Sequence, residues 1–209
     1  MTLEQLGFTH NYSPANGGTG ENTLLLLHGT GGDENDLLPL GRLLNPSANL
    51  LSPRGRVSEN GMPRFFRRLA EGVFDVPDLI AQTQALAAFI AGAAQEYGFD
   101  PACVTAAGFS NGANIAVALL LLHPSILRDA ILLHPMFPLV PDPLPNLMGA
   151  GVYISAGLRD PVASVADTER LAALLRQTGA DVSVRWQLGG HTLTREEGAE
   201  AAEWLKGRR

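Results

Sequence analysis

A single serine lies between two glycines at the point where an apolar strand is predicted to give way to an apolar helix. The motif is Gly108-Phe109-Ser110-Asn111-Gly112, with a strand predicted over 104–109 and a helix over 111–122. A serine in so sharp a turn occupies strained backbone and points its hydroxyl away from the sheet, and the glycines remove side chains that would collide. The pattern is typical of the nucleophile of a serine hydrolase, although an ordinary turn is the simpler interpretation.

A serine hydroxyl becomes a good nucleophile only when a base removes its proton and an acid orients that base. Asp160 follows a strand predicted over 152–156, and His191 follows one predicted over 182–188. Both side chains are therefore expected on loops at the carboxyl edge of the sheet, in the chain order serine, aspartate, histidine that α/β hydrolases use. We predict Ser110, Asp160 and His191 as the catalytic residues.

Asp160 and His191 also have simpler interpretations. An aspartate before a proline, as in Asp160-Pro161, is common in turns, and His191 also fits a solvated loop residue or a helix cap. His134, at the end of a predicted strand, is interpreted as a structural histidine. Other aspartates and histidines fit the catalytic roles less well because of their predicted elements or their place in the chain order: Asp142, Asp167, Asp181, His10 and His123.

A glycine-rich loop follows the strand predicted over 23–27. Its sequence, His28-Gly29-Thr30-Gly31-Gly32, allows a tight turn that exposes main-chain amides. In hydrolases such a loop supplies one donor to the oxyanion, and the residue after the nucleophile supplies the other. We predict the backbone amides of Thr30 and Asn111 as these donors. A phosphate-binding loop is the alternative, but the chain lacks the lysine and the glycine spacing that such loops require.

Four motifs together resemble the phospholipase/carboxylesterase family of α/β hydrolases over almost the whole chain. They are Leu27-His28-Gly29-Thr30-Gly31-Gly32-Asp33-Glu34, Gly108-Phe109-Ser110-Asn111-Gly112, Gly157-Leu158-Arg159-Asp160-Pro161 and Gly190-His191. The resemblance implies a three-layer α/β-hydrolase fold without a large lid, and a carboxylesterase activity. Neither a cofactor nor a metal is expected, because the dispersed histidines and the one cysteine do not form a ligand cluster.

The segment after the third predicted strand narrows this resemblance. Ser52-Pro53-Arg54-Gly55 and residues 59–67 are most similar to a bacterial carboxylesterase branch associated with hydroquinone-type compounds. Thioesterase members of the family carry Trp-Phe-Asp after a Met-Pro, whereas this chain has Phe65-Phe66-Arg67. The difference argues against a long-chain thioesterase or a lysophospholipase.

Short apolar runs alternate with amphipathic runs along the chain, which predicts a mostly parallel sheet of about seven strands with helices on both faces. The first strand is expected to pair antiparallel with the second across a turn at 16–20. Strands are predicted at 8–12, 23–27, 49–52, 104–109, 130–133, 152–156 and 182–188, and helices at 36–44, 77–96, 111–122, 165–177 and 195–206.

The longest stretch without predicted structure, 53–76, is long enough to wall an active site. It contains a basic cluster, Arg64, Arg67 and Arg68, around two phenylalanines. We predict that Phe65 or Phe66 lines the substrate pocket and favours short or aromatic esters. The alternative is that both rings only anchor the loop to the core, since buried aromatic rings are usually packing residues.

Composition is consistent with one enzyme domain over 1–209, because 209 residues that are 45% hydrophobic can bury a sizeable core. The formal net charge of −6 argues against nucleic acid or an anionic membrane as partner. Cys103 is expected to be a buried structural thiol. The amino-terminal residues resemble neither a secretory signal nor a membrane-spanning segment, so a cytoplasmic location without membrane insertion is expected.

The sequence therefore predicts hydrolysis of short-chain or aromatic carboxylic esters through an acyl-enzyme, with a small-molecule ester as partner. A close alternative is an acyl-protein thioesterase or lysophospholipase, which requires an elongated apolar groove. A distant alternative is a hydrolase fold that binds a small molecule without catalysis. The oligomeric state is left open, with a homodimer among the options.

Overall fold

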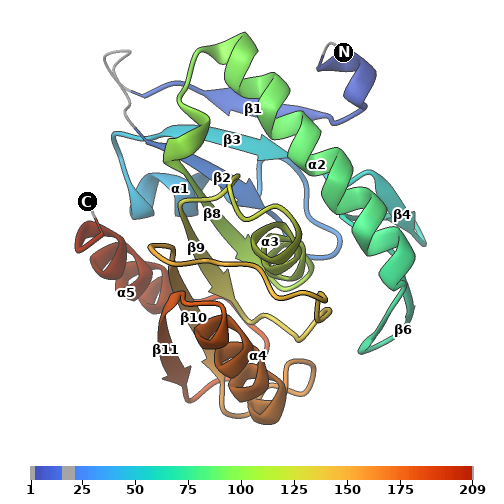
Figure 1. Cartoon of the computed structure of the whole chain (residues 1–209), viewed down its shortest axis with the longest axis vertical. Coiled ribbons are helices and arrows are strands. Elements are labelled where there is room, and N and C mark those ends of the chain that lie inside the picture. Colours follow the sequence, from blue (N-terminus) through green and yellow to red (C-terminus); the bar gives the residue numbers. More distant parts are fainter. Residues whose placement is uncertain (1–2, 16–21, 209) are drawn as a thin grey trace.

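Seven strands form one sheet in the order β1-β3-β2-β8-β9-β10-β11 in the computed structural model, which describes residues 3–15 and 22–208 (Figure 1). All neighbouring strands are parallel except β1 and β3. The strands are β1 (His10–Ser13), β2 (Thr23–Leu27), β3 (Asn49–Pro53), β8 (Val104–Phe109), β9 (Asp129–Leu133), β10 (Gly151–Gly157) and β11 (Asp181–Gln187).

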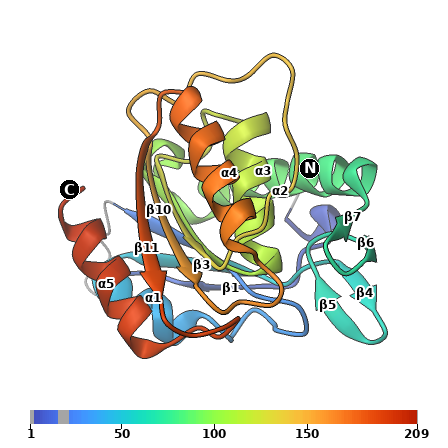
Figure 2. The same ribbon diagram turned by 90° about the horizontal axis from the view of Figure 1, so that it is seen from below.

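Helices cover both faces of the sheet, so the molecule has three layers (Figure 2). One face carries α1 (Leu38–Leu44) and α5 (Arg195–Lys206), and the other carries α2 (Val76–Tyr97), α3 (Asn111–Leu122) and α4 (Val165–Gln177). Two short 3-10 helices, η1 (Glu4–Leu6) and η2 (Pro101–Cys103), complete the helical elements of the described residues. None of the helices in these ranges is long and apolar enough to cross a membrane. The predicted three-layer α/β architecture is confirmed.

The strands form where the chain is continuously apolar, because a central parallel strand is buried on both faces. Alternate side chains of β2 enter different cores: Leu25 and Leu27 pack with the α2, α3 and α4 side, whereas Leu24 and Leu26 pack with α1 and α5. Helices α3, α4 and α5 begin and end at the predicted residues.

Capping residues set the starts of the two last helices. Ser164 accepts a hydrogen bond from the amide of Asp167 at the start of α4. Thr194 and Glu197 form a reciprocal capping box at the start of α5. The second of these caps has a further consequence, because it fixes a buried glutamate close to the sheet edge.

Strand β1 differs from its prediction, because it pairs with β3 and not with β2. Strand β2 is bonded on one side to β3 and on the other to β8, so it has no edge left for β1. The turn predicted at 16–20 lies outside the described residues. Cys103 also departs from expectation: it ends η2 partly exposed, with Sγ 3.6 Å from Oδ2 of Asp100.

The stretch 53–76 is not irregular, as the sequence suggested, but forms two small antiparallel hairpins. The first joins β4 (Val57–Glu59) to β5 (Met62–Arg64), and the second joins β6 (Arg68–Ala70) to β7 (Val73–Phe74). Strands of two or three residues with charged side chains carry no clear alternation, which explains why the pattern did not predict them. The hairpins lie beside the amino-terminal end of α2 (Figure 2).

Candidate active site

The loops that leave the carboxyl ends of the parallel strands gather the polar residues of the site at one edge of the sheet. Thr30 follows β2, Ser110 follows β8, His134 follows β9, Asp160 follows β10 and His191 follows β11. Open α/β sheets bind ligands outside the carboxyl ends of their strands, where successive connections diverge. The connections diverge in this way at β2, because the chain goes from β2 to β3 on one side of it and later to β8 on its other side.

Ser110 occupies the strained turn that the sequence predicts. Its backbone has φ 53° and ψ −113°, a conformation that L side chains rarely adopt, and its amide donates to the carbonyl of Leu133 at 2.9 Å. Gly112 permits the close approach of α3 to β2, because an added Cβ would lie 1.9 Å from the carbonyl oxygen of Leu27. The strain is thus maintained by neighbouring packing that leaves the serine no alternative.

Ser110, His191 and Asp160 form one hydrogen-bonded series. Nε2 of His191 lies 2.8 Å from Oγ of Ser110, and Nδ1 of the same ring lies 2.7 Å from Oδ2 of Asp160. The other carboxylate oxygen of Asp160 accepts from the amides of Val162 at 2.8 Å and Ala163 at 2.9 Å. The structure therefore brings together the three residues that the sequence singled out, with His191 hydrogen-bonded to both of the others.

The carboxyl group of Asp160 is buried, yet it favours the ionised form. Burial alone would raise its pKa, but hydrogen bonds from the amides of Ala163 and Val162 and from the rings of His134 and His191 outweigh burial and lower the pKa below its usual value. An ionised carboxylate only accepts hydrogen bonds. Asp160 therefore holds the proton of the His191 ring on Nδ1 and leaves Nε2 facing the serine.

A second histidine contacts the same aspartate, and sequence reasoning missed its part in the site. Nδ1 of His134 lies 2.9 Å from Oδ2 of Asp160, and its Nε2 lies 2.9 Å from Oε1 of Glu197. The hydroxyl of Ser155 also donates to that glutamate oxygen at 2.7 Å. One signal was present in the sequence: His134 directly follows a buried strand at the catalytic edge. Nothing in the sequence pairs it with Glu197, because 63 positions separate the two residues.

The carboxylates and the ring of this buried group shift one another's pKa values. Burial alone would raise the pKa of Glu197, but hydrogen bonds from His134, Ser155 and the backbone of Thr194 lower it to about 2. Burial alone would lower the pKa of His134, but the two carboxylates on either side, Glu197 and Asp160, raise it above its ordinary value. The His134 ring, bonded to a carboxylate through each of its nitrogens, therefore ties Asp160 to helix α5.

His134, Asp160 and His191 are also the only group in the described residues with the composition and spacing of a metal site. One ligand atom from each lies within 4.8 Å of the others. The Nδ1 atoms of both rings are already hydrogen-bonded to Oδ2 of Asp160. A metal ion would have to replace those hydrogen bonds and would disrupt the series that reaches Ser110.

The two predicted oxyanion residues line the cavity with the serine and are both tied to the hairpin segment. Oγ1 of Thr30 accepts from Nη1 of Arg64 at 2.5 Å, and Oδ1 of Asn111 accepts from the amide of Phe65 at 2.7 Å. Within the described ranges, neither the Thr30 amide nor the Asn111 amide donates to another backbone carbonyl. Both amides are therefore available to a ligand.

The prediction that Phe65 or Phe66 lines the pocket is wrong. Phe65 and Phe66 are 1% and 0% exposed and pack in the core. The ring centroid of Phe65 lies 4.7 Å from that of His28, and the centroid of Phe66 lies 5.3 Å from that of Phe74. Apolar rings gain most from full burial, so the chain turns them inward after β5. The cavity beside Ser110, about 40 Å³, is lined by Thr30, Arg64, Arg68, Gly72, Phe74, Ser110, Asn111, Asn114, Met136 and Val162.

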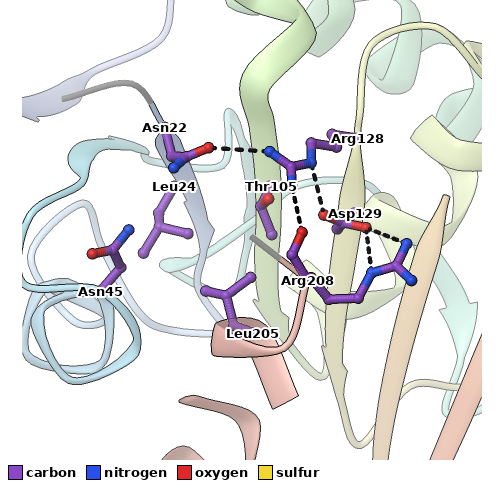
Figure 3. A pocket seen from close by; sticks show the side chains of 8 residues that line it. All are labelled: Asn22, Leu24, Asn45, Thr105, Arg128, Asp129, Leu205 and Arg208. Atoms are coloured by element: carbon purple, nitrogen blue, oxygen red, sulfur yellow. Dashed lines mark hydrogen bonds and ion pairs between the residues drawn. The ribbon is translucent and has the colours of Figure 1, made fainter. Parts of the chain in front are cut away.

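A second polar cluster lies at the amino ends of the strands and does not resemble a substrate site (Figure 3). Asp129 is 1% exposed, accepts from the amide of Gly151 at 2.9 Å, and pairs with Arg208 at 3.1 Å and Arg128 at 3.3 Å. The cavity between these groups measures only about 10 Å³. This cluster fastens the end of the chain to the sheet.

Comparisons with known proteins identify relatives among hydrolases and carboxylesterases. The chain is 52% identical over 189 residues to "Putative hydrolase MhqD" of Bacillus subtilis (strain 168), covering 90% of this chain and 94% of that protein. It superposes on the carboxylesterase of Bacillus cereus with a TM-score of 0.95 and 46% identity, covering 99% of this chain and 97% of the other. It superposes on YahD, solved with malic acid, with a TM-score of 0.91 and 28% identity, covering 97% and 100%.

A scan for family models finds no match to the chain. The two Bacillus relatives nevertheless match the chain in sequence and in fold over nearly its full length. Identities of 52% and 46% indicate a common family and not only a common fold. The chain belongs to the phospholipase/carboxylesterase family of α/β hydrolases and is an enzyme that hydrolyses esters.

Proposed function

We propose that this enzyme is a serine carboxylesterase that hydrolyses short-chain or aromatic esters through Ser110, His191 and Asp160. The observation that carries the proposal is the unbroken hydrogen-bonded series from the strained serine to the buried aspartate. A nucleophile bonded to a base that is itself oriented by an acid is the geometry required for acyl transfer.

In the proposed mechanism, Oγ of Ser110 attacks the ester carbonyl while Nε2 of His191 takes the hydroxyl proton. Asp160 stabilises the resulting imidazolium, and the amides of Thr30 and Asn111 donate to the oxyanion. The alcohol leaves with the proton from His191. Water then attacks the acyl-enzyme with the same ring as base, and the carboxylic acid departs.

The size of the cavity supports small substrates. Its volume of about 40 Å³ and its apolar walls, Phe74 and Met136, suit a short acyl group and not a long chain. The related YahD was solved with malic acid, which is a small carboxylic acid. A ligand of similar size is proposed for this enzyme.

His134 and Glu197 enter the mechanism as positioning residues. Neither lies between the serine and its base, but His134 shares Oδ2 of Asp160 with His191. Since an aspartate acts here by orienting the ring, a group that fixes the aspartate acts through it. The proposal assigns this role to the His134 ring, held in turn by Glu197.

Replacement of the nucleophile tests the proposed function. Ser110→Ala should lower kcat for para-nitrophenyl acetate by about 10³- to 10⁶-fold, and it should abolish covalent labelling by a fluorophosphonate, with little change in thermal melting. Ser125→Ala is the matched control, because Ser125 is exposed at the opposite edge of the sheet. Near-normal turnover or labelling of the Ser110→Ala protein would show that another residue is the nucleophile.

A further inference from the structure

The cavity beside Ser110 is positively charged, although the chain as a whole is acidic with a formal net charge of −6. Arg64 and Arg68 both line it, and none of the described residues that line it is an aspartate or a glutamate. The acyl-transfer steps proposed for Ser110, His191 and Asp160 assign no role to either arginine. The two guanidinium groups therefore need a separate explanation.

One carboxylate serves both arginines. Nε of Arg68 donates to Oε1 of Glu59 at 2.9 Å, and Nε of Arg64 lies 3.2 Å from Oε2 of the same glutamate. The hydrogen bond from Arg68 outweighs the effect of burial and lowers the pKa of Glu59, so the glutamate is ionised. The group of three therefore carries a net positive charge next to the nucleophile.

The two arginines differ in their exposure and in the hydrogen bonds that they make with other protein groups. Arg64 is 3% exposed and donates to the carbonyl of Phe66 and to Oγ1 of Thr30, and burial lowers its pKa. The side chain of Arg68 is 29% exposed, and within the described residues its hydrogen bonds go only to Glu59. Arg64 therefore supplies buried charge and is bonded to the loop that carries Thr30. Arg68 directs Nε and Nη2 at Glu59, which leaves the Nη1 side of its guanidinium group, unbonded within the described residues, for a ligand.

We infer that this cavity selects esters that carry a second, free carboxylate, and that Arg68 binds that carboxylate. The inference deepens the proposed esterase function and rests on it. A guanidinium group binds a carboxylate through two parallel hydrogen bonds, which fixes the orientation of the ligand as well as its charge. Two positive charges partly removed from water and balanced by one glutamate are stabilised further when an anion enters.

Pairs of esters that differ only in this carboxylate test the inference on the full chain. One pair carries it on the acyl side: mono-para-nitrophenyl succinate and its methyl ester. The other carries it on the alcohol side: para-acetoxybenzoate and its methyl ester. In at least one pair we expect kcat/KM for the anion to exceed that for the neutral ester by about tenfold, as for a charge-assisted hydrogen bond. Added salt should reduce this ratio.

Arg68→Met retains the length of the side chain without its charge and should bring the ratio of anionic to neutral kcat/KM close to one. Arg67→Met is the matched control, because Arg67 is 62% exposed, pairs with Asp75 and does not line the cavity. That variant should keep the wild-type ratio. Should Arg68→Met fail to fold, the wild-type ratio and its dependence on salt still decide the question.

The outcomes separate the two proposals. Hydrolysis of the neutral esters by wild-type enzyme, with equal kcat/KM within both pairs, would overturn the inference and leave the esterase function intact. Preference for an anion that persists in Arg68→Met would overturn the role of Arg68. Absence of hydrolysis of all four esters would overturn both the inference and the proposed function.

Discussion

Oδ2 of Asp160 accepts hydrogen bonds from two imidazole rings, and this shared oxygen is where the buried polar network meets the reacting groups. His134 lies behind the aspartate, away from the cavity that holds Ser110. It is 1% exposed and is bonded through both of its ring nitrogens. A group so placed influences the reaction through the geometry of Asp160.

Replacement of His134 should therefore lower kcat more than it changes KM. His134→Gln removes one of the two ring hydrogen bonds to Oδ2 of Asp160 and loosens the position of the carboxylate. A displacement of about 1 Å in a catalytic group costs about 100-fold in rate, so we expect a loss of about 10- to 100-fold in kcat. KM for a small neutral ester should stay within about threefold, because His134 does not line the cavity. Unchanged kcat in a folded variant would remove the positioning role.

The same buried group predicts how stability depends on pH. The folded-state pKa of Glu197 is lowered, so its contribution is present above its unfolded value of 4.5 and is lost as pH falls toward about 2. The folded-state pKa of His134 is raised, so its contribution is complete below the unfolded value of 6.5 and is lost as pH rises through the folded value. The group stabilises the fold most between about pH 4.5 and 6.5.

Urea unfolding of wild-type protein and of His134→Gln at about pH 6 and about pH 9 measures this contribution. The stability difference between the two proteins should be larger at the lower pH and should shrink at the higher, because only the protonated ring is attracted to both carboxylates. A difference that is the same at both pH values would show that His134 acts by packing alone.

At the scale of elements, the close packing of α3 on β2 sets the position of the nucleophile. Gly112 lies in the first turn of α3, where any Cβ would overlap the backbone of Leu27. The carbonyl of Leu27 belongs to a buried central strand and cannot move aside without disturbing the sheet. The glycine after the serine is thus required by the contact between two elements as well as by the turn.

Gly112→Ala should destabilise the protein by about 3 kcal/mol or more, since the overlap is with backbone and not with a flexible side chain. Thermal or urea unfolding measures the loss, and labelling of Ser110 by a fluorophosphonate should fall in parallel. Gly207→Ala is the control, because a Cβ there meets its nearest atom at 3.4 Å with an ordinary backbone conformation. Equal stability of the two variants would contradict the packing argument.

At the scale of the whole molecule, the carboxyl edge and the amino edge of the sheet, where the parallel strands end and begin, have different roles. The carboxyl edge carries the serine, both histidines and the arginine-lined cavity. The amino edge carries the Asp129 cluster, which joins β9 to β10 and to the segment after α5 (Figure 3). Because the full length of the strands separates the two edges, substitutions at the amino edge should affect stability and not chemistry.

Asp129→Ala tests this separation. The substitution leaves the buried amide of Gly151 without an acceptor and Arg208 without its carboxylate, so we expect a loss of about 1 to 3 kcal/mol in the free energy of unfolding. At temperatures where the variant is folded, kcat and the ratio of anionic to neutral kcat/KM should equal those of wild-type enzyme. A change in that ratio would indicate that the two edges are coupled.

Local sequence patterns were sufficient for the six parallel strands of the sheet, for most of the helices and for the residues at the strand ends, but not for the partner of β1 or for the two hairpins. Continuous apolar runs mark strands buried on both faces, and a parallel sheet brings all carboxyl ends to one edge. Ser110, Asp160 and His191 could therefore be proposed together from their places after three strands. Their hydrogen bonds in the structure follow from that topology, and their catalytic roles remain predictions for the Ser110→Ala experiment.

Only the tertiary structure decided the features that depend on partners far apart in sequence or on side-chain direction. His134 and Glu197 meet because α5 packs against β10, the strand next to β9, although 63 positions separate the two residues in the chain. Neighbouring side chains in 64–68 divide between core and cavity: the phenylalanines are buried, while Arg64 and Arg68 line the pocket. The amino-acid composition of 64–68 is the same whichever way each side chain points. Apolar burial and the shared charge of Glu59, which act only in the folded chain, determine which side chains face the cavity.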